Sequence, residues 1–378
     1  MVYPSNRMPD LAFLLRRPML LARDLLVDRE DPDLSRLSAE TDPERFVWSI
    51  LPHAARTFSA CIALLPAPAA RAAAVAYLYC RCLDTYEDLL PDPDERDRTL
   101  AAFAARLDGV SPRIAPGPPI DDAAVRDARD AAHVLLVTRH ELVDRVFVAL
   151  PSEVRGLIVD LVRDMADGMR WSSRIFAENG GVLRGEDDVL LYCRHVIGNP
   201  VVFTVRLIRF LRTGDSELSA ELREDSMRVG ELVQLANVTR DIEKDLRRGV
   251  AYLPELRKDL GRNVRGNAVA TERVRKVRAR LLDLALARAP SYRRMVEGMR
   301  PPMLSLGRAS AMLMLLFTER YYRGCAVRAG RGSWPGPSSG FELLFRSFGA
   351  FWSGKWADRE MRRIERRFLA QVRPTASA

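Results

Sequence analysis

Apolar residues recur at intervals of three and four along most of the chain, from Phe46 to about residue 328. This is the period of an amphipathic α-helix, whereas a half-buried strand would alternate at every second residue. Proline or glycine interrupts the pattern at most junctions, as at Pro91 and Gly214. We therefore expect an all-α protein, with helices at about 46–63, 68–90, 95–108, 121–149, 151–177, 186–213, 217–247, 268–297 and 302–328.

The pattern divides the chain into three segments. Residues 1–45 are rich in proline and charge and are interpreted as an N-terminal extension, and residues 46–329 form the main helical domain. Residues 330–378 begin with a Gly- and Pro-rich linker, expected to be flexible, and end in a basic amphipathic helix or pair of helices. The aromatic face of that last part either packs on the main domain or rests on an anionic membrane surface.

The net charge of +9 does not point to nucleic acid, because arginines alternate with acids and form no long basic block. Anionic diphosphates or an acidic membrane fit the sign equally well. The start of the chain lacks the basic-then-apolar order of a signal peptide, and the longest apolar run, 309–317, is too short to span a bilayer. We expect a cytoplasmic protein or one peripheral at the membrane; the oligomeric state is left open.

Three carboxylates share one face of the helix expected around residue 84. Asp84, Glu87 and Asp88 stand at i, i+3 and i+4, and Tyr77 and Arg81 extend the same stripe. The neighbouring residues are apolar. Because carboxylates on a largely buried helix repel one another and are costly to desolvate, a cation is expected to offset them.

A second polar stripe lies in the helix expected at 217–247. Gln234, Asn237, Asp241 and Asp245 recur at three, four and four residues, and Arg240 adjoins them. Gly249 follows and is a candidate helix terminator.

Either stripe alone is more often a solvated helix face, but two such stripes on otherwise apolar helices favour a shared site. Oxygen ligands from two helices suit Mg²⁺, which keeps several waters and binds together with substrate phosphates. No histidine pair has metal-ligand spacing, and no nucleophile or dinucleotide motif occurs. The predicted Mg²⁺ ligands are Asp84, Glu87, Asp88, Asn237, Asp241 and Asp245.

At these residues the chain resembles the squalene/phytoene synthase family of head-to-head prenyl transferases, over about residues 46–325. The two stripes match the family's two aspartate-rich motifs, and the Arg56–Ser59 segment is similar to an early element that faces a diphosphate. The family usually has an arginine where this chain has Val250, a role that Arg247 or Arg248 would have to take. The resemblance implies a single large helical bundle of the class I isoprenoid synthase type, with the stripes facing each other across the mouth of a central apolar cavity.

The resemblance also implies roles for individual residues. It assigns catalytic roles to Tyr77, Arg81, Tyr192 and Arg240, and substrate binding to Arg56, Thr57, Phe58, Gln234, Arg248 and Tyr252.

The implied reaction is a Mg²⁺-dependent condensation of two isoprenyl diphosphates through a cyclopropylcarbinyl diphosphate. The Asp84-Thr-Tyr-Glu-Asp88 spelling favours two farnesyl diphosphates giving squalene, with NADPH as reductant, or dehydrosqualene without it. One alternative is phytoene synthesis from two geranylgeranyl diphosphates. Another is a terpene cyclase-like relative acting on one diphosphate. A third is a non-catalytic helical protein that binds a membrane or a partner. Product analysis separates these alternatives.

Overall fold

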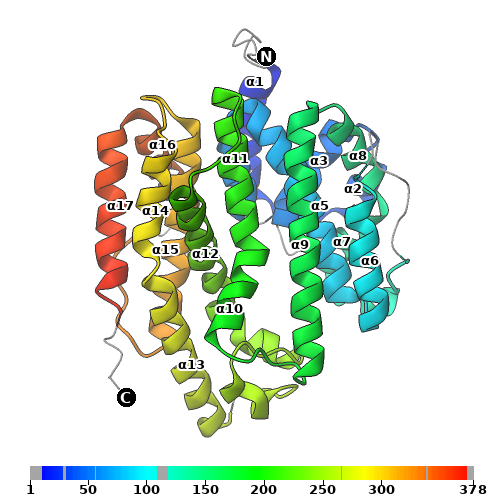
Figure 1. Cartoon of the computed structure of the whole chain (residues 1–378), viewed down its shortest axis with the longest axis vertical. Coiled ribbons are helices and arrows are strands. Elements are labelled where there is room, and N and C mark those ends of the chain that lie inside the picture. Colours follow the sequence, from blue (N-terminus) through cyan, green and yellow to red (C-terminus); the bar gives the residue numbers. More distant parts are fainter. Residues whose placement is uncertain are drawn as a thin grey trace. The chain divides into compact units, whose positions relative to one another are not determined.

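The protein is helical throughout the part of the chain that its computed structural model describes, residues 11–28, 31–55, 57–108, 118–264, 266–337 and 339–372 (Figure 1). Within these ranges the structure contains no β-strand, and the one β feature is an isolated bridge between Val182 and Ala251. The all-α class expected from the apolar period is confirmed. No described helix combines the length and apolarity needed to cross a membrane.

Contacts divide the chain into two compact units. The first unit comprises Met1–Arg170 and Phe203–Glu217, and the second comprises Trp171–Val202 and Leu218–Ala378. Two of the boundaries fall inside helices, α9 (Ser152–Glu178) and α11 (Asn199–Thr213), and the third falls in the segment that follows α11. The boundaries expected at residues 45 and 330 separate terminal segments from the main helical domain, which is a different division from these two units. Those boundaries stay a prediction.

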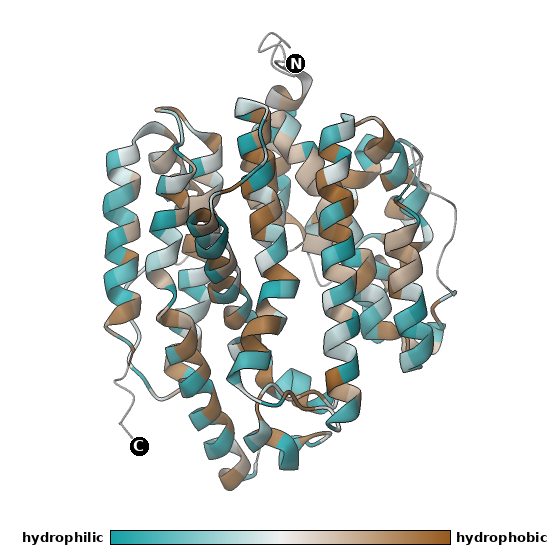
Figure 2. Cartoon of the chain, viewed as in Figure 1, coloured by the Kyte–Doolittle hydropathy of each residue, from teal (hydrophilic) through white to brown (hydrophobic). Residues whose placement is uncertain are grey.

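Several helices of each unit carry apolar residues on one side and polar residues on the other, as the colouring in Figure 2 shows for helices in view, whereas α4 is buried almost all round. The first unit contains α1 (Leu11–Leu26), α2 (Leu34–Ala39), α3 (Pro43–Ala55), α4 (Thr57–Leu64), α5 (Ala67–Leu89), α6 (Pro93–Ala105), the short 3₁₀ turn η1 (Asp122–Ala124), α7 (Ala128–Thr138) and α8 (His140–Val148). The second contains α10 (Glu186–Cys193), the π-helical turn η2 (Arg194–Gly198), α12 (Ala220–Arg247), the 3₁₀ turn η3 (Pro254–Asp259), α13 (Ala268–Leu286), α14 (Ala289–Gly298), α15 (Leu306–Arg328), α16 (Gly340–Trp352) and α17 (Gly354–Leu369).

The helix expected at 121–149 is in fact η1, α7 and α8. Arg139 leaves the helical conformation, with φ −107° and ψ 23°, between α7 and α8. Its guanidinium donates to the carbonyl oxygens of Ser38 (2.5 Å) and Glu40 (3.0 Å). A long-range anchor therefore fixes the break, which no local sequence signal indicates.

A buried polar network holds α5 from its inner side. The Tyr79 hydroxyl donates to Asp144 Oδ1 at 2.7 Å, and Arg106 donates to both oxygens of the same carboxylate at 2.8 and 3.0 Å. The Tyr79 ring also meets the rings of Phe103 and Phe147 edge-on. This network fixes the rotation of α5 and hence the face that carries its acidic residues.

The end of α12 is set by the glycine that the sequence indicated. Gly249 has φ +80°, its N–H donates to the Leu246 carbonyl oxygen, and the Val250 N–H donates to that of Asp245. This is the Schellman pattern of a glycine-terminated helix. A Cβ on Gly181 would lie 2.2 Å from the Gly249 carbonyl oxygen, so the turn at Gly181 packs directly on this terminus.

The segment between α15 and α16 is anchored, in contrast to the flexible linker expected from its glycines and prolines. Arg331 is buried and donates to both carboxylate oxygens of Asp283, and the buried Trp334 indole N–H donates to Glu319 Oε1 at 3.1 Å. Composition predicted mobility because it does not record these two side-chain anchors.

Two glycines allow η2 and α12 to touch backbone to backbone. A Cβ on Gly230 would lie 2.3 Å from Gly198 Cα and 2.4 Å from its N. Such distances are far inside van der Waals contact, so the helices could not keep this spacing with any side chain there.

Gly230→Ala is therefore expected to lower the free energy of unfolding by at least ~2 kcal/mol, because overpacking between rigid backbones cannot be relieved by a rotamer change. Denaturant unfolding followed by circular dichroism measures this. Gly324→Ala is the matched control: this glycine is exposed in α15, and no atom lies within 4 Å of the position that a Cβ would take, so the substitution should be neutral or slightly stabilising. Equal stability of Gly230→Ala and the wild type would contradict the close contact.

Candidate active site

The acidic stripe of the first unit is the part of α5 that is not buried beyond its first turns. From Ala72 to Leu90, the side chains that are half-buried or exposed are those of Tyr77, Arg81, Asp84, Glu87 and Asp88. All other side chains in that range are buried. The helical face expected from their spacing is therefore what the structure shows.

Three of these residues form a connected group. Arg81 donates through Nη2 to the Tyr77 hydroxyl at 3.2 Å, and its Nη1 lies 3.1 Å from Asp84 Oδ2. The Tyr77 ring centroid lies 5.8 Å from that of Phe58, a predicted substrate-binding residue on α4. Arg81 is thus held in one orientation, its Nε is buried, and Nη1 and Nη2 each carry a further N–H.

Burial raises the pKa of Asp84 to about 6; Arg81 opposes the shift and Asp88 adds to it. Burial also raises the pKa of the Tyr77 hydroxyl. No sequence pattern marks His133, yet burial, and then the charge of Arg81, lower its pKa to about 3, so it stays neutral. A half-buried carboxylate with a raised pKa is a charge that a bound cation would stabilise.

The second stripe lies on α12 within the second unit. Gln234 is buried and its Oε1 accepts from Asn237 Nδ2 at 3.0 Å, whereas Asn237, Arg240 and Asp241 are only half-buried. Arg240 donates to both oxygens of Asp241 at 2.8 and 2.6 Å. Its guanidinium stacks 4.8 Å from the centroid of the Tyr321 ring, a partner that only the fold could reveal.

An aromatic cluster adjoins the end of the same stripe. The ring centroids of Tyr192 and Tyr252 are 5.6 Å apart, and Phe176 lies 6.5 and 6.3 Å from them. Burial raises the pKa of Asp245 to about 7, Asp241 adds to the shift, and Arg248 and a hydrogen bond from Tyr252 oppose it. The second unit therefore brings Tyr192, which the resemblance named, together with Asp245 and Tyr252 from the second motif and its tail.

The other predicted site residues that the structure describes lie at the ends of helices. Thr57 begins α4 and is half-buried, and Arg248 is the exposed residue that ends α12. Arg56 lies outside the described residues. The two stripes belong to different units, so their meeting across one cleft stays a prediction.

The donor set fits a hard divalent cation that is shared with a ligand. Among the described residues, no three His, Cys, Asp or Glu side chains are grouped so as to hold a metal ion by themselves. Mg²⁺ usually takes one or two carboxylates and completes its shell with water and phosphate oxygens. Asp84 and Asp245, whose raised pKa values mark poorly compensated charge, are the carboxylates with most to gain from it.

Asp245→Asn should stabilise the metal-free protein, and more so at high pH. The pKa of the Asp245 carboxyl is about 7 in the folded protein, against an ordinary value of 3.8. This difference favours folding when the pH is below 3.8, and the contribution is lost as the pH rises through about 7. The melting temperature of the variant in EDTA, relative to wild type, should therefore rise from about pH 4 to about pH 8. Asp358→Asn, which changes a half-buried carboxylate paired with Arg362 in α17, is the control, and an equal difference at both pH values would contradict the shift.

Comparison with known proteins places this geometry in a family. The family described as squalene/phytoene synthase matches residues 51–328. The squalene synthase of Ganoderma lucidum is 26% identical over 228 residues, which are 60% of this chain and 46% of that protein. The chloroplastic phytoene synthase 2 of Oryza sativa subsp. japonica is 34% identical over 117 residues, 29% of this chain and 27% of that protein. The chain spans about half or less of the length of these curated relatives.

Solved structures show the same fold. A complex of TcSQS with the ligand E5700 superposes with a TM-score of 0.65 at 18% identity, covering 89% of this chain and 94% of that chain. A second TcSQS complex, with BPH1237, gives a TM-score of 0.61 at 16% identity and the same coverage. This similarity establishes the helical fold of the isoprenoid synthase type.

Proposed function

Because the chain belongs to the squalene/phytoene synthase family, we propose that it joins two isoprenyl diphosphates head to head. The observation that carries the proposal is the acidic stripe of α5, whose members are the side chains left unburied on that helix from Ala72 to Leu90. A stripe of carboxylates beside Arg81, which is held in one orientation, suits a metal–diphosphate complex. The stripe of α12 offers a second set of oxygens with its own arginine, Arg240.

Mg²⁺ held by Asp84, Asp88, Asn237, Asp241 and Asp245 would supply positive charge to the departing diphosphate. Arg81 and Arg240 each keep N–H groups beyond those used on their neighbouring carboxylates and would bind diphosphate oxygens by charge-assisted hydrogen bonds. Tyr77 would orient Arg81 and lie near the released diphosphate. Tyr192 would lie near the proton that the carbon skeleton loses.

The carbon chemistry needs a dry, polarisable surface. Departure of diphosphate leaves an allylic cation, which the double bond of the second substrate attacks, and loss of a proton closes a cyclopropyl ring. The cyclopropylcarbinyl diphosphate then ionises in turn. The aromatic group of Phe176, Tyr192 and Tyr252 offers ring faces that can stabilise cations and exclude water.

We propose two farnesyl diphosphates as substrates, with squalene as product when NADPH is present and dehydrosqualene when it is absent. Two features support the shorter substrate: the Asp84-Thr-Tyr-Glu-Asp88 spelling, and a match to a squalene synthase that extends over 228 residues, against 117 for the rice phytoene synthase. Phytoene synthesis from geranylgeranyl diphosphate is the alternative.

Competition between farnesyl and geranylgeranyl diphosphates, with Mg²⁺ and with or without NADPH, tests this proposal. The expected result is a C30 hydrocarbon formed in preference to a C40 one, with two diphosphates released per product. A preference for the C20 substrate would contradict squalene as the product and would favour phytoene. Cyclic products from a single diphosphate would contradict the proposed condensation of two substrates.

We also propose that α16 rests on an anionic membrane surface, into which a wholly hydrocarbon product could leave. The helix packs through Leu343, Ser347 and Ala350, which are buried. Its opposite side, the aromatic face, is exposed and consists of Phe341, Phe345, Phe348 and Trp352, with exposures of 68, 80, 40 and 65%. Aromatic side chains of this kind insert at the boundary of headgroups and acyl chains, and the exposed Lys355 and Arg359 at the start of α17 would meet anionic headgroups.

Phe345→Ser/Trp352→Ser should reduce sedimentation with phosphatidylserine vesicles by at least ~10-fold, because two inserted rings are lost. Val269→Ser, an equally exposed apolar residue on α13, is the control. Point variants are preferable to deleting the C-terminal helices, since Ile364 and Phe368 of α17 are fully buried and deletion would disturb the core. Unchanged vesicle binding of the double variant would contradict the membrane proposal.

A further inference from the structure

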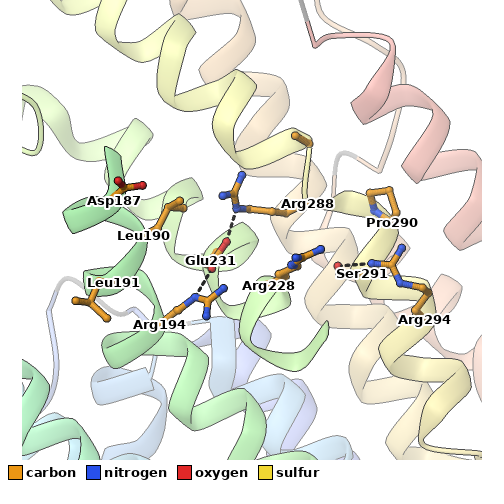
Figure 3. Close-up of a pocket in the computed structure, with 11 residues that line it drawn as sticks. Asp187, Leu190, Leu191, Arg194, Arg228, Glu231, Arg288, Pro290, Ser291 and Arg294 are labelled. Atoms are coloured by element: carbon orange, nitrogen blue, oxygen red, sulfur yellow. Dashed lines mark hydrogen bonds and ion pairs between the residues drawn. The ribbon is translucent and has the colours of Figure 1, made fainter. Parts of the chain in front are cut away.

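A cavity of about 630 Å³ opens in the second unit, at a place that none of the predicted site residues line. Its walls come from α10, η2, α12 and the junction of α13 with α14 (Figure 3). Four arginines line it: Arg194, Arg228, Arg288 and Arg294. Glu231 and Asp187 are the lining carboxylates, and two more carboxylates outside the lining, Glu224 and Asp225, pair with Arg194, Arg228 and Arg294.

Glu231 holds two of the arginines at the base of the cavity. Its side chain is only 2% exposed and accepts from Arg194 Nε at 2.6 Å through one oxygen and from Arg288 Nε through the other, as Figure 3 shows. A single carboxylate thus orients two guanidinium groups, and Arg194 Nη2 donates in addition to Glu224 Oε1 at 2.8 Å. Each guanidinium carries five N–H groups, so both retain donors for another anion.

The other two arginines lie nearer to solvent. Arg228 donates through Nε to Glu224 at 2.9 Å and keeps both terminal nitrogens, and Arg294 is held by Asp225 and by Ser291 Oγ at 2.8 Å. Their side chains are 48 and 44% exposed. They are the more exposed arginines of the cavity wall, and each is paired with a carboxylate of α12.

The backbone adds to the positive potential. Arg288 is the N-cap residue of α14, and within the described structure no side-chain hydrogen bond caps this ten-residue helix. The positive end of its dipole lies at Arg288, although Pro290 has no N–H and the Ser291 N–H already donates to the Arg288 carbonyl oxygen. Leu190, Leu191 and Pro290 supply an apolar wall beside them.

We propose that this cavity binds a diphosphate-class anion, at a site separate from the two acidic stripes. Planar guanidinium groups in fixed positions match the geometry of phosphate oxygens, and a multivalent anion would meet all four at once. The apolar wall suits the first carbons of an organic diphosphate, so inorganic diphosphate and a short isoprenyl diphosphate are the two sources of the same chemistry. The bound anion would bridge η2, α12 and α14. Binding here does not depend on the proposed catalytic activity.

Isothermal titration of the full-length protein in EDTA tests the site, because the acidic stripes repel an anion when no divalent cation is present. The probes are inorganic diphosphate and dimethylallyl diphosphate. The wild type should bind at least one of them, and Arg228→Gln/Arg294→Gln should weaken binding at least ~10-fold because two charge-assisted contacts are lost. This variant leaves the buried Glu231 with both of its partners.

Two controls make the result specific. Arg275→Gln/Arg362→Gln removes two arginines of similar exposure, each paired with a carboxylate of its own helix, and it should bind as the wild type does. Asp84→Asn/Asp241→Asn should also bind normally, so failure of the catalytic proposal would leave this result intact. Tighter binding of dimethylallyl diphosphate than of inorganic diphosphate supports an organic ligand, and the reverse supports the free anion. Absence of wild-type binding, or equal loss in the Arg275→Gln/Arg362→Gln control, would overturn the proposal.

Discussion

Asp84→Asn and Asp241→Asn are each expected to lower turnover at least ~100-fold, the size of effect seen when one electrostatic contact to developing charge is removed. Each substitution keeps the shape of the side chain and removes the anionic oxygen that would hold a cation beside the diphosphate. Asp84 sits half-buried beside Arg81, and Asp241 is held in a bidentate pair with Arg240. Both carboxylates would therefore act on the diphosphate from fixed positions.

Steady-state release of diphosphate from farnesyl diphosphate measures this loss. Asp108→Asn and Asp188→Asn are the controls, because each removes a carboxylate paired with an arginine outside the stripes, one in each unit. Both controls should keep wild-type turnover and stability. Near-normal activity of the Asp84 and Asp241 variants would mean that ionisation does not use these carboxylates.

Arg81→Gln is expected to lower turnover by a similar factor, ~100-fold, and also to move the pH dependence. Arg81 is the one named influence that lowers the pKa of Asp84, which burial raises to about 6. Without the guanidinium, that pKa rises further, so the carboxylate ionises only at higher pH. The variant should therefore recover part of its activity as the pH increases, on top of a loss that does not recover.

The matched variant is Arg170→Gln, which breaks an arginine–aspartate pair with Asp97 in the same unit without touching the stripe. It should leave both turnover and the pH profile unchanged. A uniform loss in Arg81→Gln at every pH would show that Arg81 contacts the substrate but does not control Asp84.

Helix type and the two stripes could be predicted from the sequence because both depend on local spacing. A carboxylate at i, i+3 or i+4 shares a helical face whatever the tertiary structure, and Gly249 ends α12 by a local hydrogen-bond pattern. The features that sequence reasoning missed depend on contacts between distant segments. The break at Arg139 and the anchoring of Arg331 are both of this kind.

The same distinction applies within the site. The stacking of Arg240 on Tyr321 and the neutral state of His133 arise where helices meet, so periodicity could not reveal them. The arginines around Glu231 escape sequence reasoning for a further reason. Arginines are spread through the whole chain, and only the fold distinguishes four that converge from many that pair on the surface.

The central claim is that both stripes act on one diphosphate, and a double-mutant cycle on single-turnover diphosphate release tests it most directly. Wild-type protein in excess over farnesyl diphosphate should release diphosphate only when Mg²⁺ is present. Asp84→Asn/Asp241→Asn should then be hardly slower than the slower single variant, because residues that act as a unit are not additive. A double variant slowed by the product of the two single losses, or release that does not need Mg²⁺, would contradict a shared site.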